Sequence, residues 1–106
     1  MSTPTFKSIC IPALSTRATI YTVPLATTSV IISFFIANMY STLNTTSVFI
    51  RRGGIDVALV SSVPIAVGST IQPTDGRKIF LLAGDILSVQ SEYIVDIVLS
   101  VIEGIS

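Results

Sequence analysis

Histidine and tryptophan are absent from this chain of 106 residues, and cysteine occurs once, at Cys10. Without histidine, the Ser-His-Asp and Cys-His catalytic arrangements are excluded, because both need an imidazole base. A single cysteine excludes an intrachain disulfide and a cysteine-based metal cluster. We therefore expect Cys10 to be a small buried hydrophobic residue, with an intermolecular disulfide as the alternative.

Charged residues make up only 11% of the chain and hydrophobic residues make up 50%, whereas an average soluble domain has about 25% charged residues. This deficit indicates that part of the surface faces a membrane or protein partners instead of water. The longest apolar stretch, Val30 to Tyr40, is interrupted by Ser33 and Asn38 and is shorter than the roughly 18 apolar residues of a spanning helix. We therefore expect no membrane contact and an apolar surface that partner proteins cover.

The few charges are distributed unevenly along the chain. Residues 1–53 hold four cations and no acid, and residues 54–106 hold two cations and six acids. This asymmetry predicts either opposite patches that orient neighbouring subunits or charges that mix because strands from both halves interleave. The net charge is zero, so nothing indicates binding to nucleic acid.

The abundant residues are β-branched and aromatic ones, which favour β-sheet. No stretch shows the 3.6-residue period of an amphipathic helix. Many short strands with turns about every 8–12 residues predict an all-β fold, an antiparallel β-sandwich of Ig-like or jelly-roll-like type. The strand-like runs, separated by proline, glycine and asparagine turns, cover residues 6–11, 18–23, 28–38, 46–51, 56–62, 68–72, 78–81, 85–91 and 93–102. Among the turns, Gly53-Gly54 predicts a tight hairpin, because both residues accept positive φ.

Two of the strand-like runs have an outer side that is unusually apolar. Strict alternation over residues 28–37 puts Ile31 and Phe35 on the side opposite Val30, Ile32 and Phe34, where a sandwich strand normally carries polar residues. The last run does the same with Ile94, Val98 and Ile102. We predict that this outer set forms a subunit interface; the alternative is a central strand covered by the chain's own loops.

The first 17 residues differ from the rest in being dominated by Ser, Thr and Pro. Phe6, Ile9 and Ile11 are embedded among them as apolar anchor points. This composition predicts an N-terminal arm over residues 1–17, which adds a strand to the edge of a neighbouring chain. A β-sandwich domain over residues 18–106 would follow it. The alternative is that the first residues form an ordinary edge strand of the same domain.

No motif for catalysis, cofactor binding or metal binding is found. The six acids are scattered among turns and strands with no spacing that predicts a carboxylate pair. Gly53-Gly54 resembles a phosphate loop only superficially, since no helix is expected after it. The neighbouring Arg51 and Arg52 are further interface candidates, because they can meet an acidic partner, although an exposed pair beside a hairpin is the commoner case.

Aromatic platforms for carbohydrate are weakly supported by the sequence. Tryptophan is missing, and Tyr21, Tyr40 and Tyr93 are far apart in the chain. A carbohydrate-binding or host-surface-binding module would require these tyrosines to gather on an exposed face.

Five segments follow one another in a characteristic order over residues 18–104. They are Tyr21-Thr22-Val23-Pro24, the hydrophobic strand from Val30 to Asn38, the turn from Val63 to Ser69, Leu81-Leu82-Ala83-Gly84-Asp85, and the closing strand with its acidic end from Val98 to Glu103. In the order and spacing of these segments, the chain resembles small virion structural proteins of tailed bacteriophages, of the kind found in cyanophages. The chain departs from that resemblance in one loop, where Met39, Tyr40 and Leu43 replace small and polar residues.

The resemblance implies a repeated β-sandwich component of a phage particle. We expect a non-enzymatic homo-oligomer that binds the major capsid protein, or neck or tail proteins, in a virion assembled in the host cytoplasm. A small, neutral sandwich with an arm suits gluing neighbouring capsomers, so capsid decoration is the favoured role. A neck, collar or tail component is the alternative within the same class.

Overall fold

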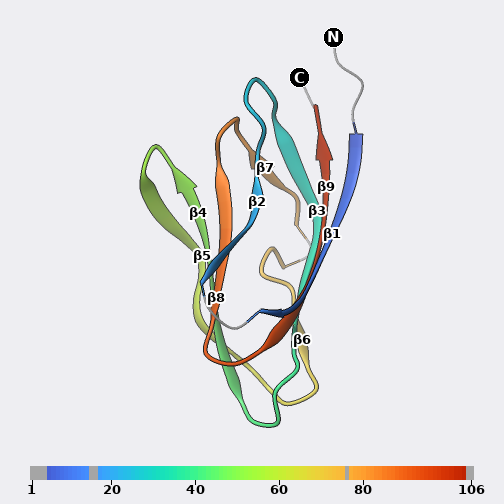
Figure 1. Cartoon of the computed structure of the whole chain (residues 1–106), viewed down its shortest axis with the longest axis vertical. Helices are drawn as coiled ribbons and strands as arrows, with labels where there is room; N and C mark the ends of the chain where they lie inside the picture. The colour runs from blue at the N-terminus through green and yellow to red at the C-terminus, as the bar shows by residue number, and fades with distance from the viewer. Residues whose placement is uncertain (1–4, 15–16, 76, 105–106) are drawn as a thin grey trace.

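The computed structural model of the chain describes residues 5–14, 17–75 and 77–104 (Figure 1). These residues form β-strands joined by turns and loops, and no helix occurs among them. Each strand coincides with a run that the sequence predicts, with bounds that shift by a few residues. The strands are β1 (Thr5–Leu14), β2 (Ala18–Thr22), β3 (Ser29–Asn38), β4 (Asn44–Arg52), β5 (Ile55–Ile65), β6 (Thr70–Ile71), β7 (Ile79–Leu81), β8 (Ile86–Ser91) and β9 (Val95–Glu103).

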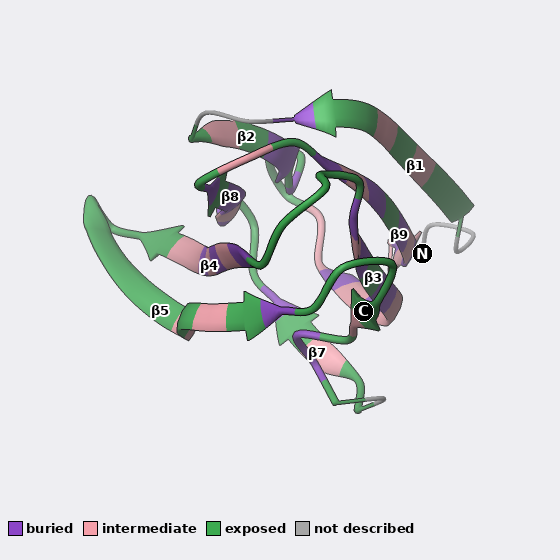
Figure 2. Cartoon of the chain, turned by 90° about the horizontal axis from the view of Figure 1, so that it is seen from below, coloured by how far each residue is buried: buried purple, intermediate pink, exposed green. Residues whose placement is uncertain are grey.

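The strands form two antiparallel sheets that face each other (Figures 1 and 2). The first, called here the β1 sheet, has the order β1-β9-β3-β6, and β7 also pairs with β3. The second, the β2 sheet, has the order β2-β8-β4-β5. The predicted all-β antiparallel sandwich is therefore confirmed.

The hydrophobic core lies between the inner faces of the two sheets, where Figure 2 shows the buried positions. Every second residue of β9 points inward, as expected for a strand with one buried face. Its inward residues Val95, Ile97, Leu99 and Val101 are at most 1% exposed. Phe34 and Ile36 of β3, and Leu87 and Val89 of β8, complete the centre of the core.

Strand β3 does not alternate as the sequence predicts, because its pairing with β9 shifts register between Ile31 and Ser33. The extra residue, Ile32, is a β-bulge, and a bulge exchanges the two faces of the strand on either side of it. Phe35 is 37% exposed on the outer side as predicted, but Ile31 is fully buried in the core. The assignment of Ile31 to a subunit interface is therefore wrong.

The N-terminal segment is not seen as a separate arm. Strand β1 is the edge strand of the β1 sheet and pairs with β9 over most of its length. Ile9 and Ile11 face inward and pack against the core, so their prediction as anchors on another chain is corrected. Residues 1–4 and 15–16 of the predicted arm lie outside the described residues.

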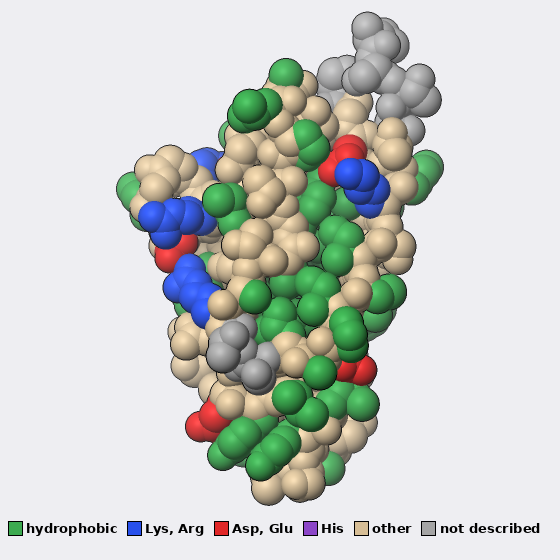
Figure 3. Space-filling model, in the orientation of Figure 1, with side chains coloured by type: hydrophobic (Ala, Val, Ile, Leu, Met, Phe, Trp, Pro, Cys, Tyr) green, Lys and Arg blue, Asp and Glu red, His purple; other side chains and the backbone are tan. Residues whose placement is uncertain are grey.

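The neighbouring residues of β1 point the other way. Phe6 is 74% exposed, and Cys10 is exposed on the same outer side. The expectation of a buried Cys10 is wrong, because successive residues of a strand face opposite sides and the partly buried Ile9 and Ile11 occupy the inward positions. Figure 3 shows hydrophobic side chains at the surface between β1 and β2, the strands at this edge of the two sheets.

The β4–β5 hairpin turns as predicted at Gly53 and Gly54. Their φ angles are +62° and +79°, which glycine adopts without the strain of a Cβ atom. This turn brings Arg51 opposite Asp56 on the next strand.

Candidate interaction surfaces

The outer face of the β1 sheet carries two apolar rows with a serine row between them. Residues paired directly across antiparallel strands lie on the same face, so the register defines each row. The upper apolar row contains Phe6, Ile102, Val30 and Phe80; the serine row contains Ser8, Ser100 and Ser33; and the lower apolar row contains Cys10, Val98 and Phe35. We call these three rows the outer patch.

The outer patch is accessible and uncharged. Phe6 is 74% exposed, Phe80 52%, Val98 41% and Phe35 37%. With strands about 4.8 Å apart and a rise of about 3.3 Å per residue, the rows span about 14 Å across the strands and about 13 Å along them. Including the bordering side chains, this is a few hundred Å² of largely apolar surface, a size that occurs on monomers and is often functional.

A second exposed surface lies at the end of the sandwich formed by the β3–β4 and β8–β9 loops. There the rings of Tyr40 and Tyr93 stack with centroids 4.1 Å apart and planes 8° from parallel. Met39 is 53% exposed, Leu43 56% and Ile94 37%. We call these five residues the aromatic tip. The sequence did not predict it, because the two tyrosines are 53 positions apart and meet only through the fold.

Two buried asparagines at strand ends hold the loops of the aromatic tip. Asn38 accepts a hydrogen bond from the Tyr40 backbone N–H at 2.9 Å and donates to the Ile65 carbonyl oxygen at 3.0 Å. Asn44 accepts from the Tyr93 N–H at 3.0 Å and donates back to the Tyr93 carbonyl oxygen at 3.1 Å. Since each amide satisfies backbone groups of a loop, the tyrosines are presented in a fixed position.

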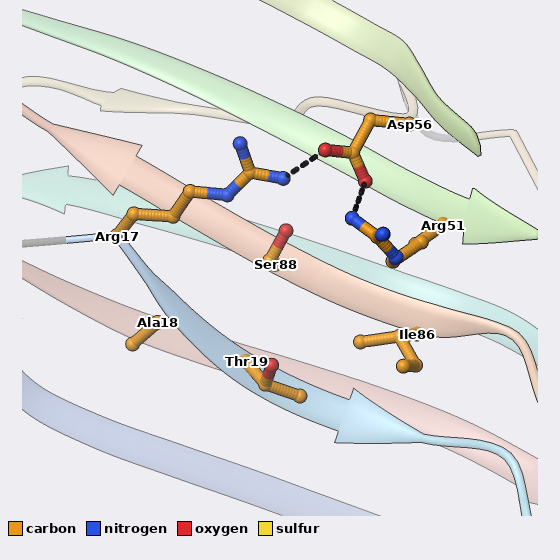
Figure 4. Close-up of a pocket in the computed structure, with 7 residues that line it drawn as sticks. All are labelled: Arg17, Ala18, Thr19, Arg51, Asp56, Ile86 and Ser88. Atoms are coloured by element: carbon orange, nitrogen blue, oxygen red, sulfur yellow. Dashed lines mark hydrogen bonds and ion pairs between the residues drawn. The ribbon is translucent and has the colours of Figure 1, made fainter. Parts of the chain in front are cut away.

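The outer face of the β2 sheet is polar, in contrast to the outer patch. A shallow pocket there is lined by residues of all four strands and of the segment before β2 (Figure 4). Arg17 and Arg51 both point to Asp56, with N···O distances of 2.6 and 3.4 Å. The Arg17 guanidinium also lies 4.4 Å from the centroid of the Phe49 ring, a cation–π contact. Arg51 thus has a partner within its own chain, and it shares that partner with Arg17.

Arg52 is also engaged within the chain. Its guanidinium donates to both carboxylate oxygens of Asp85, with distances of 2.9 Å to Oδ1 and 2.5 Å to Oδ2. Asp85 is 2% exposed and also accepts from the Leu82 N–H. The hydrogen bonds from Arg52 lower the pKa of the Asp85 carboxyl, although its burial acts in the opposite direction. This pair joins the end of β4 to the β7–β8 turn.

A buried acid, Glu103, lies between the sheets at the end of β9. Tyr21 of β2 donates a short hydrogen bond to its carboxylate, and Lys7 of β1 approaches it at 3.1 Å. Burial would raise the pKa of Glu103, but the hydrogen bonds from Tyr21 and Lys7 outweigh it and the pKa is lowered. Burial, aided by Glu103, raises the pKa of Tyr21 to about 12. This cluster links both sheets and fits a structural role.

The described ion pairs settle how the uneven charges are arranged. Each pairs a cation from residues 1–53 with an acid from residues 54–106. The charges of the two halves therefore mix because their strands interleave, as the second of the two alternatives predicted.

The described residues show no convergent acids that could hold a metal ion, since no group of three or more Cys, Asp and Glu side chains lies together. Along the same residues, no helix is long and apolar enough to span a membrane. Of the interface residues predicted from the sequence, Phe6, Phe35, Val98 and Ile102 lie in the outer patch and Ile94 in the aromatic tip.

Comparisons with known proteins give no match: none is found among protein-family models, among curated proteins or among solved structures. The outer patch and the aromatic tip are therefore the features from which a function can be inferred.

Proposed function

We propose that this chain is a non-enzymatic structural component of a phage particle that binds other virion proteins and decorates the capsid shell. The outer patch is the observation that carries this proposal. Four strands present a surface without charged side chains in which three phenylalanines are exposed, and exposed apolar patches of this kind are often functional. Covering this surface provides binding free energy without any chemical reaction.

The proposal includes the jelly-roll type of sandwich. The first strand pairs with the last, the second with the second-last, β3 with β6 and β7, and β4 with β5. Such nested pairs describe a long hairpin rolled into two sheets. In an Ig-like sandwich the first and last strands belong to different sheets, whereas here β1 and β9 pair side by side. Jelly rolls occur in viral capsid proteins and in lectins, so the fold type agrees with the proposal without determining the function.

The resemblance in turn order and spacing supports a phage particle, and the neutral, small sandwich favours the shell. A neck, collar or tail protein would use the same apolar surface in fewer copies. The proposal therefore predicts a location within the particle: the virion head, at a copy number comparable to that of the shell protein.

The test is to purify phage particles from cells infected by the phage whose genome encodes this chain. Mass spectrometry then quantifies the chain in head, neck and tail fractions. We expect stoichiometric recovery with heads, and loss of the Val98→Glu variant from them. Recovery of a few copies with necks or tails would replace the decoration role by the alternative. Absence from every particle fraction would overturn the proposal.

A second candidate function, binding of carbohydrate on a host surface, is favoured by one observation. Tyr40 and Tyr93 come together at the aromatic tip, the clustering that such a module requires, while Tyr21 is buried. Ring faces of this kind pack against the C–H groups of a sugar. Glu92 is the charged residue in the sequence between Ser91 and Ile94, so a neutral glycan fits better than an anionic one.

Binding of the purified chain to immobilised neutral polysaccharides tests this candidate. Tyr40→Ala should abolish retention, and Val98→Glu, on the outer patch, should leave it unchanged. Equal retention of Tyr40→Ala and the unmodified chain would eliminate the aromatic tip as a sugar site.

A further inference from the structure

We propose that the outer patch is occupied by a second copy of the chain, related to the first by a two-fold axis that runs parallel to the strands between β9 and β3. This inference rests on the proposed function, in which the outer patch binds other virion proteins. It names a second copy of the chain as the protein that the outer patch binds. Under this axis, β9 of one copy lies over β3 of the other, and β1 lies over β7.

The upper apolar row reads almost the same from both edges of the sheet. Its order from β1 to β7 is Phe6, Ile102, Val30 and Phe80. The two-fold axis therefore places Phe6 over Phe80 of the second copy and Ile102 over Val30. Contacts of this reciprocal kind define an isologous interface, and aromatic pairs at its two ends add to the apolar burial.

The central pairs of the other two rows obey the same symmetry. In the serine row, Ser100 meets Ser33 of the second copy, so small hydroxyl-bearing side chains face each other near the axis. In the lower apolar row, Val98 meets Phe35, and the reverse contact is made by the second copy. Apolar side chains thus face apolar ones in both apolar rows, where two packed sheets about 10 Å apart can interdigitate them.

The acid that borders the outer patch meets no like charge in this arrangement. Asp96 of β9 is paired with Ala37 of β3, so the axis places Asp96 over Ala37 of the second copy. Its carboxylate accepts a hydrogen bond from the Ala13 N–H of its own chain at 2.9 Å. Like charges that face each other in an interface would cost several kcal/mol.

The size of the outer patch predicts a weak dimer. A standard interface buries about 800 Å² on each partner, and the few hundred Å² of the outer patch fall below it. Interfaces of this small size belong mostly to weak, transient associations. A dimer of this strength forms at high local concentration, as on a particle surface, and separates on dilution.

Sedimentation velocity of the full chain over a concentration series from micromolar to millimolar tests the inference. We expect reversible conversion from monomer to dimer. Val98→Glu and Phe35→Lys should each weaken dimerisation by about 100-fold or more, because each buries two unpaired charges per dimer. Mixing the two variants should restore a mixed dimer. The introduced carboxylate at position 98 of one copy then meets the introduced ammonium at position 35 of the other, and the second contact keeps the native Val98 and Phe35.

Val57→Glu, on β5 of the opposite sheet and 59% exposed, is the matched control and should dimerise like the unmodified chain. A chain that stays monomeric, forms trimers, or loses association equally with Val57→Glu would overturn the inference. So would two folded variants that fail to associate when mixed. Recovery of a strictly monomeric chain in phage heads would reject the two-fold dimer and leave the proposed function standing.

Discussion

At the scale of single residues, the buried asparagines are the most consequential polar side chains. Asn44 is fully buried, and its amide satisfies backbone groups of Tyr93 and accepts from the Ser91 hydroxyl at 3.1 Å. A buried polar group left without its partner costs about 1–3 kcal/mol. One side chain thus determines whether the β8–β9 loop keeps its conformation.

We expect Asn44→Ala to lower the free energy of unfolding by about 2–4 kcal/mol, because more than one buried group loses its partner. Urea denaturation followed by circular dichroism measures this. Ser61→Ala, at an exposed position of β5, serves as the control and should change stability by less than about 0.5 kcal/mol. An equally small effect for Asn44→Ala would mean that the loop is not held by this amide.

The carboxylates of Asp85 and Glu103 predict how stability depends on acidity. Both have pKa values lowered in the folded chain, so folding favours their ionised forms. Their contribution is present above the unfolded values, near 4, and is lost as pH falls through the lowered folded values. We expect the urea midpoint to fall between about pH 4 and pH 2, and the fall to be smaller in Glu103→Gln. A midpoint that is flat over this range in the unmodified chain would contradict it.

Some of these residues were visible in the sequence and others were not. Glu103 continues the inward alternation of Val95, Ile97, Leu99 and Val101, which signals a buried acid that needs a partner, but the partner Tyr21 is 82 positions away. The Tyr40–Tyr93 stack likewise depends on long-range pairing. The alternation of apolar and polar residues predicts which face of the sheet a residue occupies. Its neighbours on that face depend on which distant strands pair with its own strand.

At the scale of elements, β3 is the strand that decides which residues are exposed. The number and order of strands could be predicted, because turn residues and β-branched runs are local signals. The bulge at Ile32 could not, because nothing in Val30-Ile31-Ile32-Ser33 distinguishes an inserted residue from regular alternation. The segment of β1 was ambiguous for a similar reason, since an edge strand and an arm have the same composition.

Deletion of Ile32 tests the role of the bulge. Without the extra residue, either Ser29 and Ile31 or Phe34 and Ile36 must turn outward, because a one-residue slip exchanges the faces of a strand. We expect loss of the cooperative unfolding transition or a destabilisation above about 4 kcal/mol. Ile32→Thr, which keeps the residue, should cost about 1 kcal/mol or less. A deletion variant as stable as Ile32→Thr would show that β3 tolerates either register.

At the scale of the whole molecule, the sandwich is elongated, with extents of 47 × 26 × 21 Å, and its two outer faces differ in chemistry. The outer face of the β1 sheet presents the uncharged outer patch. The β2 sheet presents Arg17, Arg51 and Asp56 around a polar pocket (Figure 4). An assembly that covers the first face would leave the polar pocket of the second face in water.

Hydroxyl-radical footprinting with mass spectrometry tests the central claim most directly, because it measures side-chain access at the outer patch and the aromatic tip in one sample. The chain would be labelled dilute and free, and again in its associated or particle-bound state. We predict that Phe6, Phe35 and Phe80 lose reactivity on association while Met39 keeps its reactivity. Unchanged phenylalanines together with a protected Met39 would contradict the account and show that the aromatic tip, not the outer patch, is the binding surface.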